Sequence, residues 1–171
     1  AAYVLLGAGW LIMKTEGDLQ RHAVKWAKLA WVPVLIGMGL ISLATPVVSE
    51  TVRSKWFGMP GFIALLPIPL MTLAALVGAR AMLNSQRVLG KLCWLPFALT
   101  VSVFVLGAIG LAYSLFPYVV MDRLTIWQAA SATEALAVIA IGCAITVPTI
   151  LGYTVFSYRV FWGKATALRY A

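Results

Sequence analysis

The residues that could move protons are few, and they lie at the ends of apolar runs. The chain has five carboxylates, which are Glu16, Asp18, Glu50, Asp122 and Glu134. A proton relay across a membrane needs Asp, Glu or His inside the apolar run itself, and none of these carboxylates has such a position. The only histidine, His22, follows Arg21 in a polar segment. The pattern therefore predicts no relay along acidic residues in these runs.

Residues that could bind a metal or act as nucleophiles are equally sparse. Cys93 and Cys143 stand in separate apolar runs without a CxxC or Cys/His grouping, which favours free buried thiols over a disulfide or a zinc site. Haem iron could be bound by His22 or by a methionine, but a solvated histidine and packing methionines are the better interpretation. The chain has no glycine-rich phosphate loop and no HExxH pattern. We therefore expect no catalytic, cofactor-binding or metal-binding residue in this chain.

One motif stands out where the first apolar run ends. It consists of Lys14, Thr15, Glu16 and Gly17. Lys14 can reach the membrane interface, Glu16 can pair with it or with a neighbour, and Gly17 permits a tight turn. The motif is interpreted as a structural cap at the edge of the membrane.

Composition identifies the setting of these residues. The chain has 171 residues, of which 63% are hydrophobic and 11% charged, and its mean hydropathy is +0.96. Ordinary soluble domains have about 25% charged residues, so this composition excludes a soluble fold. The formal net charge is +8. Because the basic residues lie between apolar runs, membrane topology explains this charge better than nucleic-acid binding does.

The apolar runs predict an all-α fold, a polytopic transmembrane helical bundle of about five spans in one unit covering residues 1–171. The spans are expected at residues 1–13, 29–48, 62–83, 92–116 and 135–162. As a helix the first run covers roughly 20 Å of a hydrocarbon core that is roughly 30 Å thick, so it is too short to span. The chain is therefore interpreted as the C-terminal part of a longer subunit.

The connections carry local signals of their own. Residues 15–28 have apolar positions at helical spacing and predict an amphipathic connection at the membrane surface. Pro67 and Pro69 predict a bend in the third span. Capping-box spacing over residues 125–128 predicts a short turn of helix, and the same spacing over residues 131–134 predicts the start of the last span.

Basic residues are distributed unequally between alternate connections. Ten lie in the first and third connections and the C-terminal tail, and three lie in the second and fourth connections. The positive-inside rule therefore predicts that the first and third connections and the C-terminus are cytoplasmic.

Three segments of the chain resemble a known family. They are GAGWLIMKTEGDLQ at residues 7–20, SLFPYVV at 114–120 followed by LTIWQAAS at 124–131, and the last helix and tail from Pro148 to Lys164. They are similar to the Lys-Thr-Glu-Gly region, the late outer loop and the last helix of subunit II of the cytochrome bd family of quinol oxidases. The family includes a cyanide-insensitive type, and the resemblance leaves open which type the chain represents.

The resemblance implies a subunit of a complex in the bacterial inner membrane that oxidises quinol, reduces dioxygen to water and contributes to the proton gradient. Haems b and d and the quinol site belong to subunit I in that family, and subunit II holds no haem. The implied partners are this haem-bearing subunit, a small single-span subunit, membrane lipids and quinone, and a structural quinone or lipid is a further expectation. The motif Lys14, Thr15, Glu16 and Gly17 carries over as a structural motif only.

Two other functions fit parts of the pattern. Half of a secondary transporter is one, because Pro67, Pro69 and Pro148 could interrupt helices around a substrate site. The absence of charged residues deep in a span argues against ion coupling in such a transporter. A membrane scaffold without chemistry is the other. Under the oxidase hypothesis, small residues of the fourth span such as Ala98, Ser102 and Gly107 would let a partner helix approach closely.

Overall fold

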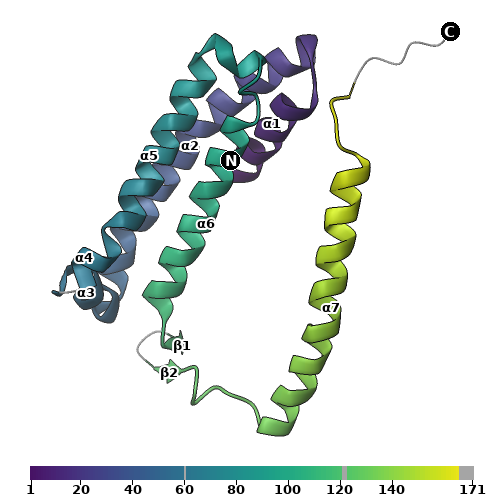
Figure 1. Ribbon diagram of the computed structural model, residues 1–171. Helices are drawn as coiled ribbons and strands as arrows, with labels where there is room; N and C mark the ends of the chain where they lie inside the picture. The colour runs from purple at the N-terminus through teal and green to yellow at the C-terminus, as the bar shows by residue number, and fades with distance from the viewer. Residues whose placement is uncertain (60, 121–122, 166–171) are drawn as a thin grey trace. The chain divides into compact units, whose positions relative to one another are not determined.

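Helices make up most of the described chain, and they divide into two compact units. The computed structural model describes residues 1–59, 61–120 and 123–165. The first unit comprises Ala1–Phe116 and the residues from Lys164 on, and the second comprises Pro117–Gly163. The elements in Figure 1 are α1 (Ala2–Lys14), α2 (Gly17–Val48), α3 (Glu50–Phe57), α4 (Gly61–Leu65), α5 (Pro67–Asn84), the 3-10 helix η1 (Gln86–Leu89), α6 (Leu95–Leu115), β1 (Tyr118–Val120), β2 (Leu124–Thr125) and α7 (Thr133–Val160). The predicted all-α fold is confirmed.

Small side chains let α1 and α2 pack closely together. Ala23, Ala27 and Ala30 of α2 are at most 5% exposed, and their i, i+4, i+7 spacing places them on one face of the helix. Leu5, Ala8 and Ile12 of α1 belong to the same buried cluster. Lipid tails are as apolar as these side chains, so close contact rather than exclusion of water has to stabilise such a helix pair.

The structure corrects one expected boundary, because α2 is a single helix from Gly17 to Val48. The sequence predicts a surface connection over residues 15–28 that is separate from the span at 29–48. The buried face of α2 runs from Gln20 to Val34 without interruption, so the two segments share one packing surface. A helix of 32 residues is about 48 Å long, which exceeds the roughly 30 Å hydrocarbon core. The first turns of α2 therefore extend beyond the apolar layer.

The polar connection after α2 contains a short helix that the sequence analysis did not predict. The Ser49 hydroxyl caps α3 by accepting a hydrogen bond from the backbone N–H of Val52 at 3.4 Å. Val52 is fully buried, so α3 is packed against the first unit rather than extended into solvent.

The third span is interrupted at Leu66, between α4 and α5. Pro67 is the first residue of α5, a position at which its missing N–H is harmless. The backbone N–H of Leu70 bonds the carbonyl of Leu66 at 3.4 Å, a long bond next to the break. The interruption lies where the two prolines predict a bend.

Two glycines lie where α5 and α6 contact each other, at distances that would leave a Cβ in ordinary van der Waals contact. A Cβ on Gly78 would lie 3.4 Å from Leu99 Cδ1, and a Cβ on Gly110 would lie 3.5 Å from Ile68 Cγ2. Thr72 of α5 and Thr100 of α6 are buried, and each hydroxyl donates to the carbonyl four residues earlier in its own helix. These polar groups are thus satisfied within the apolar interface.

The second unit consists of a small β-ribbon followed by α7. β1 pairs with β2 in antiparallel orientation, with Tyr118 opposite Thr125. The predicted capping box at residues 125–128 forms, since Thr125 N donates to Gln128 Oε1 at 3.0 Å, but it closes a turn and no helix follows. The spacing at residues 131–134 predicts the start of the last span correctly, since α7 begins at Thr133, but no side-chain cap forms there.

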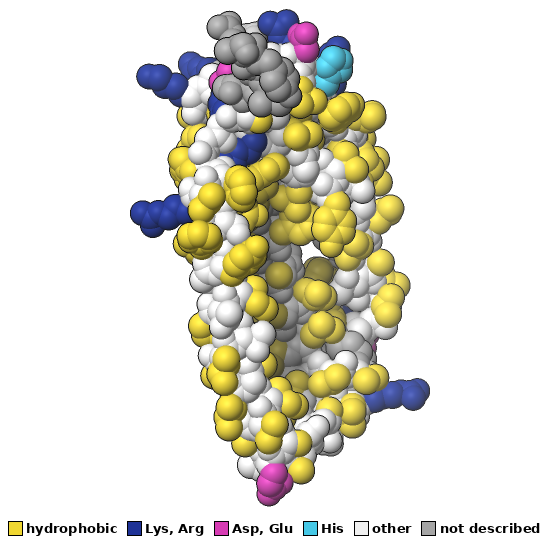
Figure 2. All heavy atoms as spheres, turned by 90° about the vertical axis from the view of Figure 1, so that its right-hand side faces the viewer, with side chains coloured by type: hydrophobic (Ala, Val, Ile, Leu, Met, Phe, Trp, Pro, Cys, Tyr) yellow, Lys and Arg dark blue, Asp and Glu magenta, His cyan; other side chains and the backbone are white. Residues whose placement is uncertain are grey.

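Apolar side chains cover much of the surface. Figure 2 shows hydrophobic side chains along the whole length of the face in view. In the described part of the chain, four helical stretches are long and apolar enough to cross a membrane: Gly17–Val48, Gly61–Asn84, Leu95–Leu115 and Thr133–Val160. α1 is apolar but shorter. The chain is thus a multi-pass membrane protein.

Candidate functional site

The Lys-Thr-Glu-Gly motif forms the corner between α1 and α2. α1 ends at Lys14 and α2 begins at Gly17, so Thr15 and Glu16 are the linking residues. The backbone N–H and the hydroxyl of Thr15 both donate to the carbonyl of Leu11, at 2.9 and 2.7 Å. Gly17 has φ of +67°, in the left-handed region that favours glycine. The motif therefore reverses the chain within two residues.

A buried glutamine fastens the corner from the side of α2. Gln20 is 4% exposed, and its Nε2 donates to the carbonyl of Ile12 at 2.8 Å. This carbonyl lies in the last turn of α1, where backbone acceptors lack partners within the helix. The sequence analysis assigned Gln20 no role. The available signal was its spacing, because Gln20 lies on the same face as Ala23 and Ala27 and therefore had to be buried.

Residues near the C-terminus also contact the corner. Lys164 Nζ lies 3.3 Å from Glu16 Oε1, and the backbone N–H of Ala165 donates to the carbonyl of Lys14 at 2.7 Å. Lys14 Nζ lies 5.2 Å from the centroid of the Trp10 ring, in cation–π contact. Sequence reasoning considered Lys14 or a neighbour as the partner of Glu16, and the structure places Lys164 there.

The chemistry available at the corner is hydrogen bonding and ion pairing. The Glu16 side chain is 60% exposed, and its carboxylate is paired with Lys164. The Thr15 hydroxyl bonds a carbonyl in the last turn of α1, and the Gln20 amide bonds a carbonyl of α1 from α2, so only Gln20 joins the two helices. The arrangement can hold two helix ends and a C-terminal residue together.

The remaining candidate residues lie apart from one another. His22 is exposed, and its Nδ1 donates to the carbonyl of Asp18 at 2.8 Å, outside the apolar part of α2. Glu50 pairs with Arg53 at 3.3 Å, and Glu134 lies in the first turn of α7. Cys93 and Cys143 are free. Two other candidates, Met121 and Asp122, lie outside the described residues.

The described residues were also compared with the requirements of a metal site. Residues 1–59, 61–120 and 123–165 contain no group of three or more His, Cys, Asp or Glu side chains that could hold a metal ion. Met38 and Met82 pack against the buried cluster of the first unit, as gap-filling side chains do.

A second polar cluster, also unpredicted, joins α3 to the end of α6. Trp56 Nε1 donates to Ser114 Oγ at 3.0 Å, and Ser114 Oγ donates to the carbonyl of Gly110 at 2.8 Å. Lys55 Nζ donates to the carbonyl of Phe116, beyond the last turn of α6. A lysine at this place stabilises carbonyls that the helix leaves without partners. Only the tertiary fold reveals this cluster, because its members are separated by more than fifty residues.

An arginine and a tryptophan join α5 to α2 near the other end of the unit. Arg80 Cζ lies 5.4 Å from the centroid of the Trp31 ring, and Arg80 Nη1 lies 3.4 Å from the carbonyl oxygen of Lys28. Trp31 Nε1 donates to the carbonyl of Leu76 at 2.9 Å. Arg80 is thus held by the protein.

Comparison with known proteins places this arrangement in a family. The family described as cytochrome bd terminal oxidase subunit II matches residues 1–161. A search of curated proteins finds no significant match to the chain. The matched region includes the α1–α2 corner and all of α7, and it covers far more than half of the 171 residues. The chain therefore belongs to the family of cytochrome bd terminal oxidase subunit II.

Proposed function

We propose that this chain acts as the haem-free subunit of a membrane complex that oxidises quinol and reduces dioxygen to water. Its role in that complex is to support the assembly and stability of a haem-bearing subunit, which houses the redox chemistry. The family match over residues 1–161 carries this proposal. The contribution to the proton gradient is then made by the complex, with protons taken from the cytoplasmic side.

The positions of the ionisable side chains support a role without a catalytic centre. Glu16 lies in the α1–α2 corner, while Asp18, Glu50 and Glu134 lie in the first turns of their helices. Acidic groups at helix starts are favoured by the helix dipole and need no functional explanation. Electron transfer in the complex would therefore depend on groups of a partner subunit, and proton uptake on groups outside residues 1–171, such as carboxylates in earlier helices of the same subunit.

The exposed small residues of α6 support a partner interface. Ser102 and Gly107 are exposed, and a Cβ built on Gly107 meets nothing within 4 Å. The Ser102 hydroxyl donates to the carbonyl of Ala98 at 2.9 Å, so it presents no unsatisfied donor to a neighbour. A face of this kind allows a second helix to approach closely. We assign it to contact with the haem-bearing subunit.

The proposed orientation follows from the distribution of basic residues. The first and third connections predicted from the sequence, together with the residues around the end of the last span, have ten basic residues, against three in the second and fourth connections. This places the corner and the C-terminus at the cytoplasmic face of the bacterial inner membrane. The Lys-Thr-Glu-Gly motif then serves as a structural corner at that face.

The test is to isolate the complex through an affinity tag on this chain and record its reduced-minus-oxidised spectrum. A haem-bearing polypeptide should co-purify, and it should keep its haem after the two polypeptides are separated. Gly107→Leu should lower the haem recovered per tagged chain several-fold. Gly37→Leu on α2 is the matched control, because Gly37 also has nothing within 4 Å. Haem remaining on the separated tagged chain would refute the proposal.

The transporter alternative receives no support from the helices that it requires to be broken. Pro33 and Pro46 lie inside a continuous α2, and Pro148 lies inside a continuous α7. The break at Leu66 is followed at once by α5. Discontinuous helices around a midplane site are the feature on which that alternative depends.

A further inference from the structure

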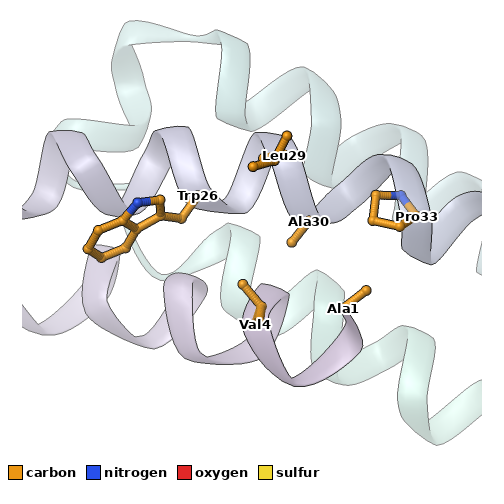
Figure 3. Close-up of a pocket in the computed structure, with 6 residues that line it drawn as sticks. All are labelled: Ala1, Val4, Trp26, Leu29, Ala30 and Pro33. Atoms are coloured by element: carbon orange, nitrogen blue, oxygen red, sulfur yellow. The ribbon is translucent and has the colours of Figure 1, made fainter.

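An apolar groove runs between α1 and the first half of α2. Its volume is about 190 Å³, and it is lined by Ala1, Val4, Trp26, Leu29, Ala30 and Pro33. Figure 3 shows that these residues come from two neighbouring segments, with Ala1 just before α1, Val4 on α1 and the other four on α2. From Trp26 to Pro33 the groove follows α2 for about 10 Å. It is therefore an elongated surface feature rather than a closed cavity.

The end of the groove near the corner is polar and basic. Trp26 is 46% exposed, and the described residues offer its indole N–H no hydrogen-bond acceptor. The ring of His22 lies 6.3 Å from the Trp26 ring, one turn closer to the corner. Lys25 is exposed and lies one turn from Leu29. The nearest carboxylate in the sequence of α2, Asp18, is seven residues before Lys25, or about 10 Å along the axis.

We propose that this groove binds an anionic phospholipid. One acyl chain lies against Val4, Leu29 and Pro33, and the phosphate lies beside the ammonium group of Lys25 and the indole N–H of Trp26. Tryptophan favours the headgroup level of a bilayer, and lysine attracts anionic lipid at the same level. The apolar part of the groove thus corresponds to the acyl chain of a phospholipid, and its basic end, with Trp26 and Lys25, corresponds to the phosphate.

The headgroup has to provide the selectivity. The acyl chains of different lipids are equally apolar, so an apolar groove inside a bilayer binds them with similar free energy. A basic residue near an anionic surface adds roughly a fivefold preference for the anionic lipid. The proposal is independent of the oxidase function, because it concerns the lipid contact of this chain alone.

The experiment uses the intact membrane complex in vesicles of phosphatidylcholine and phosphatidylglycerol. A diazirine on the acyl chain of either lipid labels nearby residues on irradiation, and mass spectrometry locates the labels. The phosphatidylglycerol probe should label residues 1–7 and 26–33 about fivefold more than the phosphatidylcholine probe. Raised salt should weaken that preference, since a Debye length of about 10 Å at 0.1 M falls to about 3 Å at 1 M.

Two sets of variants test separately the contribution of the lipid headgroup and that of the apolar groove. Lys25→Gln should abolish most of the preference, Lys25→Arg should keep it, and Lys91→Gln in the α5–α6 connection is the control for general surface charge. Val4→Trp should fill the groove and reduce labelling by both probes. Val77→Trp on α5 is its matched control, because Val4 is 55% and Val77 56% exposed.

Three results would overturn the proposal. They are equal labelling by the two lipids in the unmodified complex, an unchanged preference in Lys25→Gln, and groove residues that cross-link to protein instead of lipid. Only variants that still co-purify with haem are compared. A failure of the oxidase assignment would therefore show in the spectrum, and a failure of the lipid site would show in the labelling.

Discussion

α6 and α7 are equally apolar helices with different packing. Both are long and apolar enough to span a membrane. α6 has four buried residues, namely Pro96, Thr100, Val103 and Ser114, whereas α7 has none. The difference lies in close contacts within each unit, since Gly110 of α6 lies against Ile68 of the same unit, while Gly142 and Gly152 of α7 have nothing of their own unit within 4 Å. Apolar composition thus identifies a span without identifying what it packs against.

The comparison shows where stability in this fold must come from. In water an apolar helix is driven to pack, but in a bilayer the lipid satisfies the same surface. The first unit therefore depends on shape, with small residues in the contacts and polar side chains bonding backbone carbonyls. Among the described residues of its own unit, α7 has neither close contacts at small residues nor polar side chains that bond another helix. Substitutions in α7 should therefore change the free energy of unfolding less than substitutions in the first unit.

The largest expected difference concerns isoleucine truncation. Ile12 of α1 is fully buried, whereas Ile139 of α7 is 58% exposed. Ile12→Ala should leave a cavity and lower the free energy of unfolding by about 2 kcal/mol or more. Ile139→Ala should change it by less than about 0.5 kcal/mol. Denaturant unfolding of the intact subunit in detergent micelles, followed by tryptophan fluorescence, gives both values. Equal losses would mean that α7 is packed as tightly as α1.

Glycine enlargement sharpens the same comparison. A Cβ on Gly9 would lie 3.2 Å from the backbone Cα of Phe97, whereas one on Gly152 meets nothing within 4 Å. Gly9→Leu should force α1 away from α6 and cost about 1–3 kcal/mol. Gly152→Leu should leave the unfolding midpoint of the isolated subunit unchanged. A destabilised Gly152→Leu subunit would contradict this expectation.

The helices could be predicted from the sequence because hydropathy and length are local properties. The expected span at residues 92–116 corresponds to α6 at Leu95–Leu115, and the expected last span corresponds closely to α7. The continuity of α2 was missed because charged residues in its first turns indicate a surface segment. The periodic alanines from Ala23 to Ala30 were the sign that this segment and the span form one helix.

The corner could be predicted in part, and its partners could not. Gly17 indicates a turn by its type, and its positive φ agrees with that. Lys164 lies almost 150 residues from Glu16 in sequence, so nothing local connects the two side chains. The same holds for Trp56 and Ser114, whose hydrogen bond depends on the packing of α3 against α6.

A smaller effect is expected from the backbone of the corner. Gly17 has φ of +67°, so Gly17→Ala should cost about 1–2 kcal/mol by forcing a side chain into the left-handed region. Gly37→Ala lies inside α2 with nothing within 4 Å, and it should stabilise the helix by up to about 1 kcal/mol. Both substitutions add one methyl group, but they are expected to change the free energy of unfolding in opposite directions. Thermal unfolding of both variants checks the sign, and a stabilising Gly17→Ala would contradict the corner geometry.

The smallest expected effect concerns the ion pair between Glu16 and Lys164. Glu16→Gln should lower the free energy of unfolding by less than about 1 kcal/mol, because exposed pairs contribute little. Glu50→Gln is the control, since Glu50 pairs with Arg53 at the same 3.3 Å distance. Both glutamates lie at helix starts, so their interaction with the helix dipole is similar.

The exposure of the basic partners decides which loss is greater. The Lys164 side chain is 31% exposed and the Arg53 side chain 61%, so Glu16→Gln should cost slightly more than Glu50→Gln. Unfolding measured at low and high salt checks this, because salt should reduce both losses and the Glu50 loss more completely. A loss well above 1 kcal/mol for Glu16→Gln would show that the residues following α7 are anchored at the corner far more firmly than an exposed pair allows. The contrast between α7 and the packed helices would then weaken, since the end of α7 would be fixed through its tail.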